Sequence, residues 1–188
     1  MHQAEIAALI RTLSTGIYGV GVHHDGEDRI FTASWIMPVS FNPVLIALSI
    51  NPQHRSYQML KKSGVFSVNV IGQDHAELAD KLAGPGDRLQ GLEWFKGITS
   101  CPLLKCAIAH LECRVEQEYP AGDHQLIVGA LMGGSILKPH TQRLLYAETG
   151  NLDGSIALFP EHLPGSTPES TKTRDELTDQ WGPPINEA

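Results

Sequence analysis

The amino-acid sequence predicts a mainly β domain, an antiparallel barrel with Greek-key connections and short flanking helices. About six short segments that are apolar or alternate between apolar and polar residues follow one another closely. Glycine, proline, asparagine and aspartate separate them, as they do at turns. Strands do not alternate regularly with long helices, which argues against a doubly wound parallel sheet and favours a closed barrel.

Composition limits both the size and the partners of the protein. The chain has 188 residues, 41% of them hydrophobic, which favours one domain with a substantial core. Its formal net charge is −7, and a nucleic-acid-binding protein would normally carry a basic face. Any phosphate site must therefore be local, built from backbone N–H groups and one or two cations.

The beginning of the chain and its cysteines indicate a cytoplasmic protein. Met1–Leu13 carries Glu5 and only a short apolar stretch, so it does not read as a secretory signal. No apolar run approaches about 18 residues, so we expect no membrane segment. Cys101, Cys106 and Cys113 are odd in number and form no CxxC motif, which predicts reduced thiols and no metal site.

The first half of the chain alternates strands and turns around one short helix. Ile6 and Leu9 lie on one face of an amphipathic N-terminal helix, and Gly64 stands where helices commonly end. In order, we expect a helix over 4–13, strands over 16–24 and 29–36 around a hairpin turn at 25–28, a proline-marked connection over 38–43, a buried strand over 44–50, a helix over 56–62 and a strand over 65–71.

The second half adds two long strands and a tail. Asp74 is expected to cap a helix over 75–82, and residues 88–103 look irregular, held down by Trp94 and Phe95. Strands follow over 107–119 and 125–137, and the glycines of the second indicate bulges. We expect one domain over residues 1–160 and a proline-, serine- and threonine-rich tail over 161–188 that forms no core of its own.

The first candidate binding segment is Thr32–Pro43. Thr32, Ser34 and Ser40 bring small hydroxyl side chains along a strand that enters a proline-marked turn. Backbone amides at such a strand end can face a ligand, because barrels hold ligands there. The alternative is an ordinary polar strand end.

The second candidate segment is Ser49–Tyr57, where a core strand passes through a turn into a helix. Free N–H groups and the positive end of the helix dipole favour a phosphate at this turn. Arg55 would supply a bidentate cation and Ser56 a hydroxyl donor. The alternative is that Ser56 only caps the helix and Arg55 is a solvated charge.

The third segment, Gly122-Asp123-His124, places a histidine at the start of a strand. Alone it is weak evidence, since such a histidine can simply hold a loop.

In order along the chain, the three segments and the Gly64–Val70 segment GVFSVNV resemble the flavin reductase family, over about residues 16–150. Two features of the family are missing. Where members often have two consecutive prolines, this chain reads Asn42-Pro43-Val44, and residues 146–152 lack the aromatic residue of a Tyr-Gly-aromatic pattern.

The resemblance implies an FMN-binding Greek-key split barrel that forms a homodimer, with the flavin in a groove near the dimer interface. FMN (or FAD) would lie along the strand that ends at Trp35, with its phosphate held by Ser40, Arg55 and Ser56. His124 would stand on the nicotinamide side as the catalytic residue. The implied cofactor-binding set is Thr32, Ala33, Ser34, Trp35, Ser40, Ser49, Asn51, Arg55 and Ser56.

The function that follows from the resemblance is an NAD(P)H-dependent flavin reductase, which transfers hydride from the nicotinamide of NADH or NADPH to the flavin. Two alternatives remain open at this point. One is a flavoredoxin-type FMN electron carrier that serves a protein partner. The other is a non-catalytic dimeric flavin-binding module. The electron acceptor, whether a monooxygenase, a ferric complex or another electron-transfer protein, is left open by the sequence.

Overall fold

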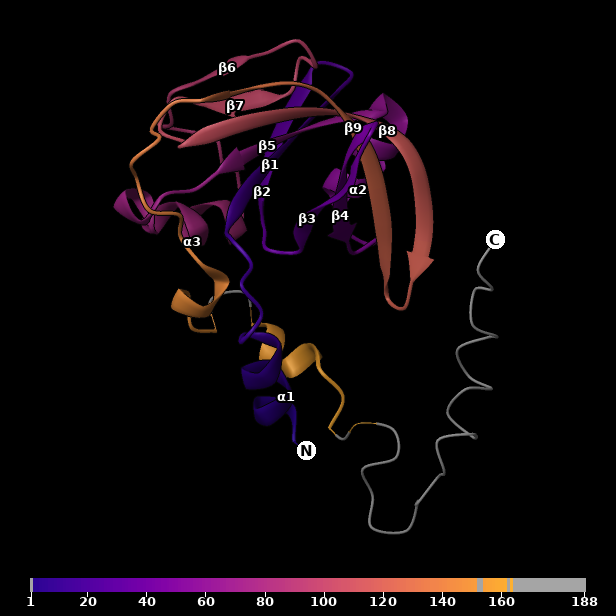
Figure 1. Ribbon diagram of the computed structural model, residues 1–188, viewed down its shortest axis with the longest axis vertical. Coiled ribbons are helices and arrows are strands. Elements are labelled where there is room, and N and C mark those ends of the chain that lie inside the picture. The colour runs from indigo at the N-terminus through magenta and orange to yellow at the C-terminus, as the bar shows by residue number, and fades with distance from the viewer. Residues whose placement is uncertain (1, 152–153, 162, 164–188) are drawn as a thin grey trace. The chain divides into compact units, whose positions relative to one another are not determined.

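The computed structural model of the protein describes residues 2–151, 154–161 and 163 (Figure 1). Its main feature is a seven-stranded antiparallel sheet with the strand order β2-β1-β5-β8-β9-β4-β3. The strands are β1 (Tyr18–His24), β2 (Glu27–Ala33), β3 (Ile36–Phe41), β4 (Val44–Ile50), β5 (Val65–Val70), β8 (Ala109–Ala121) and β9 (His124–Ile136). The predicted mainly β class is confirmed.

Short helices and a small second sheet complete the described part of the chain. The small sheet pairs β6 (Trp94–Lys96) with β7 (Pro102–Leu104). The helices are α1 (Gln3–Ile10), α2 (Arg55–Ser63) and α3 (Glu77–Ala83), with 3₁₀ turns η1 (Gln73–His75), η2 (Tyr146–Glu148) and η3 (Ser155–Leu158).

The chain divides into two compact units. Leu13–Asp153 contains both sheets, whereas Met1–Thr12 and Gly154–Ala188 form the other unit, in which α1 packs against η3 and Gln3 Nε2 donates to the Phe159 carbonyl at 2.8 Å. The predicted tail, 161–188, lies outside the described residues apart from Glu161 and Leu163.

The large sheet is curled, because its two edge strands are neighbours in sequence. Only Ser34 and Trp35 separate β2 from β3, so Ala33 and Ile36 lie within about 10 Å of each other. Yet no hydrogen-bonded pairing of β2 with β3 occurs in the described residues. The expected closed barrel is therefore wrong in detail. The sheet is bent by its connectivity and stays open along the β2–β3 seam, as in a split barrel.

The two faces of the sheet pack into two hydrophobic clusters. One contains Phe31 and joins sheet residues to α2, while the other contains Ile30 and joins the sheet to α3. Because successive side chains of a strand point to opposite faces, Glu27 and Arg29 share the α2 side with Phe31. Thr32 shares the α3 side with Ile30, and its hydroxyl donates to the Ala79 carbonyl at 2.8 Å.

Several predicted local features are confirmed. Asp25 and Gly26 have φ values of 48° and 77°, as a tight hairpin turn between β1 and β2 requires. Gly64 ends α2 in the left-handed conformation with φ 70°. In β9, Met132 is an extra residue, since Glu112 is paired with Gly133 and Cys113 with Leu131, so the expected bulge next to the glycines is present.

Three local predictions were wrong. The supposed connection over 38–43 is largely β3, which accommodates Pro38 because an edge strand can lack a donor on its open side. Residues 88–103 are not wholly irregular, since β6 and most of β7 fall there. Asp74 does not cap α3, whose N-cap is Ala76, and instead accepts a hydrogen bond from Lys138 Nζ at 3.0 Å.

Candidate functional site

An exposed aromatic pair stands where β2 gives way to β3. The ring centroids of Trp35 and His124 are 5.2 Å apart, with 42° between the ring planes. Pairing of β4 with β9 puts them together, because Ile50 lies opposite Gln125 and the Ser49 N–H donates to the Trp35 carbonyl at 3.0 Å. Trp35 is 39% exposed, so part of its indole face is open to a ligand.

His124 is held by its neighbour in the hairpin turn. Its Nδ1 lies 2.7 Å from the Asp123 carboxylate, and this hydrogen bond lowers the pKa of Asp123. Since a carboxylate only accepts, Nδ1 carries the hydrogen and Nε2 is left for other contacts. A neutral His124 therefore offers an acceptor at Nε2, and a protonated one offers a donor.

The turn between β4 and α2 is organised by side chains. Asn51 Oδ1 accepts from the Gln53 N–H at 2.9 Å, and His54 caps α2 by accepting from the Ser56 N–H at 3.3 Å. The cap is thus His54, and the alternative reading of Ser56 as the cap is wrong. Ser56 is fully buried, and its Oγ has no hydrogen-bond partner within the described residues.

Three arginines surround this turn with little acidic compensation. Glu27 accepts from Arg55 at 2.6 Å and from Arg29 at 3.3 Å, and these contacts oppose the effect of burial and leave the pKa of Glu27 lowered. Burial first, and then the charges of Arg88 and Arg29, lower the pKa of His54. Burial and Arg29 also lower the pKa of Arg88. An anion placed here would relieve this repulsion.

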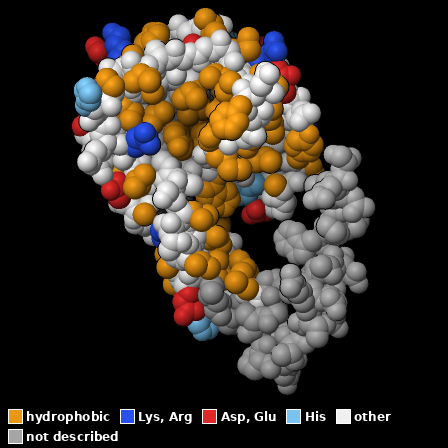
Figure 2. Space-filling model, viewed as in Figure 1, with side chains coloured by type: hydrophobic (Ala, Val, Ile, Leu, Met, Phe, Trp, Pro, Cys, Tyr) orange, Lys and Arg blue, Asp and Glu red, His pale blue; other side chains and the backbone are white. Residues whose placement is uncertain are grey.

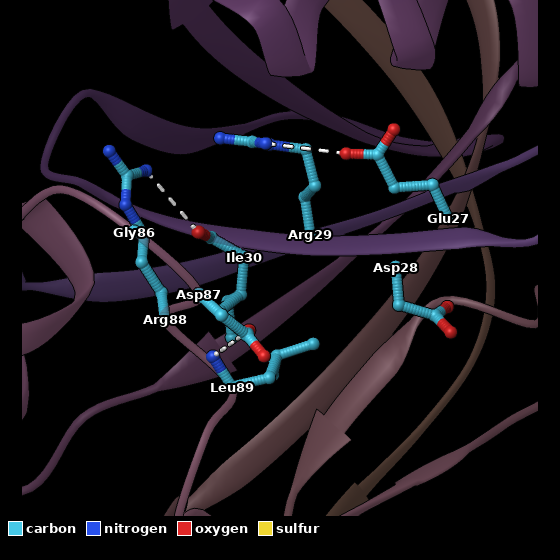
Figure 3. Close-up of a pocket in the computed structure, with 8 residues that line it drawn as sticks. All are labelled: Glu27, Asp28, Arg29, Ile30, Gly86, Asp87, Arg88 and Leu89. Carbon is cyan, nitrogen blue, oxygen red and sulfur yellow. Dashed lines mark hydrogen bonds and ion pairs between the residues drawn. The ribbon is translucent and has the colours of Figure 1, made fainter.

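A cavity of about 460 Å³ opens beside the free edge of β2 (Figure 3). The heads of Arg29 and Arg88 lie on one side of β2, and Asp28 points to the other. Arg88 reaches the Ile30 carbonyl, at 3.4 Å. The lining residues are Glu27, Asp28, Arg29, Ile30, Gly86, Asp87, Arg88 and Leu89.

The predicted site residues are only partly brought together. Trp35, Ser49 and His124 meet at one end of the sheet, and Arg55 and Ser56 follow from the same end of β4. Ala33 packs against the core cluster on the α2 side, and Ser34 is half-buried in the link to β3.

Ser40 and Thr32 are placed differently from the rest. Ser40 lies opposite Leu45, and Ile50 is five residue steps further along β4, about 17 Å away, so Ser40 is remote from Arg55 of the same chain. The Thr32 hydroxyl is already bonded to Ala79.

Sequence reasoning missed Arg29, Arg88 and His54. No local sequence pattern marks these three residues, because they lie on separate elements. Arg29 lies on β2, Arg88 follows α3, and His54 directly precedes α2. Only the pairing and packing of distant segments bring the two arginines to His54 at one turn.

A run of large apolar side chains is exposed along β3, β4 and β9. Phe41, at the tip of the β3–β4 hairpin, is 99% exposed, and this hairpin leads to the part of β9 that β4 does not cover. Figure 2 shows hydrophobic side chains gathered around a hollow on the viewed face. The exposed residues on these strands are Met37, Val39, Phe41, Val44, Leu131, Met132 and Ile136.

Neither a membrane-spanning helix nor a cluster of metal-binding side chains is found in the described residues. No helix there is long and apolar enough to cross a membrane. No group of three or more histidine, cysteine, aspartate or glutamate side chains there is arranged to hold a metal ion.

Comparison with known proteins gives a consistent result. The family described as flavin reductase like domain matches residues 10–153. A flavin reductase (NADH) from Kitasatospora aureofaciens is 32% identical over 68% of this chain and 69% of its own length. The reductase component of a 4-hydroxyphenylacetate 3-monooxygenase from Thermus thermophilus is 30% identical over 69% of this chain and 81% of its own length.

A solved structure agrees with these matches. The NADH:FAD oxidoreductase of Streptomyces globisporus, in complex with NAD and FAD fragments, superposes with a TM-score of 0.73 at 25% identity, covering 78% of this chain and 89% of the other. The chain spans 34% of the length of a curated relative from Rhizobium meliloti and 62% of the length of one from Streptomyces coelicolor.

The lowered pKa of His54 predicts a pH dependence of stability. The folded protein holds His54 neutral, whereas the unfolded chain binds a proton near pH 6.5. Unfolding therefore takes up a proton as the pH falls below that value, and stability decreases toward the folded pKa. We expect the free energy of unfolding, measured with urea, to fall between pH 7.5 and 5.5 in the wild-type protein. The fall should be smaller in His54→Asn, which retains a capping side chain. Equal losses in the two proteins would exclude His54 as the cause.

Proposed function

Because this chain belongs to the flavin reductase like domain family, we propose that it binds FMN and passes hydride to it from NADH or NADPH. One observation carries the proposal. From Arg29 on β2, beside the cationic turn, to Trp35 of the exposed aromatic pair in the link to β3, the chain runs six residues, at most about 20 Å. Such a span suits a ligand with a planar ring at one end and a phosphate at the other.

The side chains at the turn suit a phosphate. Arg29 Nε is buried and without a hydrogen-bond partner in the described residues, and so is Ser56 Oγ. Buried polar atoms are normally paired, so two unpaired ones at a helix N-terminus favour an anion there. We propose that Arg29, Arg55 and Ser56 hold the phosphate, and that Ser40, which is remote from this turn, does not do so within the same chain.

The free edge of β2 suits the flavin ring. Among the described residues β2 pairs with β1 alone, so half of its backbone N–H and C=O groups face away from the sheet. The ring is proposed to lie along Thr32–Trp35, with backbone groups and the indole of Trp35 as its contacts and Ser49 and Asn51 near its edge. Thr32 would take part through its backbone, because its hydroxyl is bonded to Ala79.

Little catalytic chemistry is required of the protein. A bound flavin supplies the two-electron acceptor, so no acid–base pair is needed. The chain has to hold a nicotinamide ring against the flavin with the reacting atoms about 3–3.5 Å apart. His124 is proposed as the positioning group, because Asp123 fixes its ring and leaves Nε2 to bond the nicotinamide amide.

A homodimer is proposed from the exposed apolar strands. Monomers rarely expose a contiguous row of large apolar side chains, and Phe41 is 99% exposed at one end of this row. A second copy of the chain would cover it in a two-fold arrangement. The proposed cofactor site includes the link that leads directly into β3, so dimer formation would bring the partner close to the flavin.

We propose that the protein is cytoplasmic and that its reduced flavin serves an oxygenase, since the Thermus relative is by name the reductase component of a monooxygenase. The alternative of a flavoredoxin-type carrier differs in keeping its FMN, and the non-catalytic module differs in not oxidising nicotinamide. Oxidation of NADH and NADPH, measured with and without added FMN or FAD, separates the three. No oxidation of either nicotinamide under any of these conditions would rule out the reductase.

The Arg55→Ala variant tests the phosphate turn. Loss of a charge-assisted hydrogen bond should weaken FMN binding by about 1.5–3 kcal/mol, while riboflavin, which lacks the phosphate, should bind as before. Calorimetric titration measures both. Arg114→Ala, which removes an exposed arginine that bonds only Glu116, is the matched control. Unchanged FMN affinity in Arg55→Ala would contradict the assignment.

The His124→Ala variant tests the positioning role. We expect anaerobic bleaching of bound flavin by NAD(P)H to slow by about tenfold or more, the effect of losing about 1.4 kcal/mol in the transition state. FMN affinity and melting temperature should change little. Stopped-flow spectroscopy and a thermal melt measure these quantities. A lower melting temperature with an unchanged bleaching rate would instead assign His124 to holding the hairpin.

The Phe41→Glu variant tests the homodimer. A charge within an apolar interface should weaken the dimer and shift the sedimenting mass toward the chain mass of 20.5 kDa. Leu158→Glu, at another exposed apolar position in the other unit, should leave the mass unchanged. Wild-type protein that already sediments as a monomer at micromolar concentration would end the proposal.

A further inference from the structure

Two of the four methionines of the chain lie on the exposed apolar strands. In the single chain, Met37 on β3 is 57% exposed and Met132 on β9 is 48% exposed. Met59 is buried in the core cluster that includes α2, and Met1 lies outside the described residues. The surface proposed for the homodimer thus carries two accessible thioethers, and the core holds a shielded one for comparison.

Both exposed methionines have neighbours that could not bind an added oxygen atom. Met37 lies on the edge strand β3, opposite Ala47 and directly before Pro38. Met132 is the extra residue of the β9 bulge and follows Leu131. The side chains of these three neighbours carry no hydrogen-bond donor. An oxygen atom on either sulfur would therefore find no donor in them once a second chain excludes water.

The proposed reaction supplies an oxidant for such side chains. Reduced flavin that meets O₂ in place of its acceptor gives up two electrons and two protons, which yields oxidised flavin and hydrogen peroxide. The methionine sulfur attacks one peroxide oxygen, so the S–O bond forms while the O–O bond breaks. The other oxygen leaves as water with both protons. Sulfur loses two electrons and peroxide gains two, so the sulfoxide forms without a further reactant.

The cysteines compete poorly for peroxide. Cys101 and Cys113 are fully buried, and burial raises the pKa of the Cys101 thiol to about 11 and that of Cys113 to about 12. Burial also raises the pKa of the half-buried Cys106. Peroxide reacts with the thiolate, which is scarce at neutral pH for such thiols, whereas a thioether needs no deprotonation. The exposed methionines are therefore the sites that peroxide should reach first in the described part of the chain.

We propose that Met37 and Met132 are peroxide-sensitive modification sites, and that their oxidation to sulfoxides in the free chain prevents it from forming the homodimer. The inference rests on the proposed function, which provides both the dimer and the source of peroxide. A sulfoxide is polar, and burial of its oxygen without a donor opposes association. Because dimers exchange with free chains, a reductase that turns over without its acceptor would progressively lose its dimer. Methionine sulfoxide reductases would reverse the loss.

The test adds hydrogen peroxide directly to the full chain, so that its result does not depend on flavin turnover. Peptide mass spectrometry measures the gain of oxygen at each methionine, and sedimentation measures the dimer. We expect Met37 and Met132 to be oxidised about tenfold or more faster than the buried Met59. The Kd of the dimer should rise by about tenfold or more, the effect of one buried polar group without a partner. Methionine sulfoxide reductase should restore the dimer.

Leucine variants provide the matched controls. The double variant Met37→Leu, Met132→Leu keeps the apolar volume and should retain its dimer after the same treatment, whereas Met59→Leu should respond as the wild type does. A dimer that persists with both methionines oxidised, or a double variant as sensitive as the wild type, would overturn the proposal. A wild-type protein that is monomeric before treatment would end the proposed homodimer and this inference with it. Failure to oxidise NADH or NADPH would refute the proposed reductase alone, since the peroxide in this test is added.

Discussion

The constraint on which the rest of the structure depends is the two-residue link between β2 and β3. These strands are the outermost of a seven-stranded sheet, yet Ser34 and Trp35 alone join them. A flat sheet would separate the two edges by six inter-strand spacings, about 28 Å, which this link cannot span. The sheet therefore has to curl. The curl brings Trp35 to the ends of β4 and β9, beside His124, and leaves the outer edge of β2 unpaired.

That free edge is stabilised on the α3 side. Ile30 packs in the cluster with α3, the Thr32 hydroxyl bonds the Ala79 carbonyl, and Arg88 donates to the Ile30 carbonyl. An edge strand with open backbone groups is prone to pair with another chain, so these contacts also limit unwanted association. The opposite face of the same strand, with Arg29 and Phe31, is directed to α2. Because side chains alternate between the two faces of β2, this strand contacts the hydrophobic cluster with α3 on one face and the proposed phosphate turn at α2 on the other.

The sequence predicted those features that depend on neighbouring residues. Alternation of apolar residues located most strands, and the need for a positive φ at Gly64 located the end of α2. It did not predict β3, because Pro38 is compatible with a strand only at a sheet edge, and edges follow from the strand order. It also missed the approach of Arg29 and Arg88 to His54, which comes from segments far apart in the chain. The family resemblance grouped Ser40 with Arg55, although the β3–β4 hairpin carries them to opposite ends of β4.

The cation cluster at the α2 turn would give an acidic protein a local site for the proposed phosphate. With a formal net charge of −7, the long-range field repels nucleotides, so attraction has to arise within about a Debye length, about 8 Å at physiological ionic strength. In the proposed site Arg29, Arg55 and Arg88 would provide it, and burial first, then the neighbouring arginine charges, lower the pKa values of Arg88 and His54. Like charges held together destabilise the free protein, and an anion bound among them removes that repulsion. Ligand binding and folding stability are therefore coupled through this turn, since a ligand that binds only the folded state stabilises it.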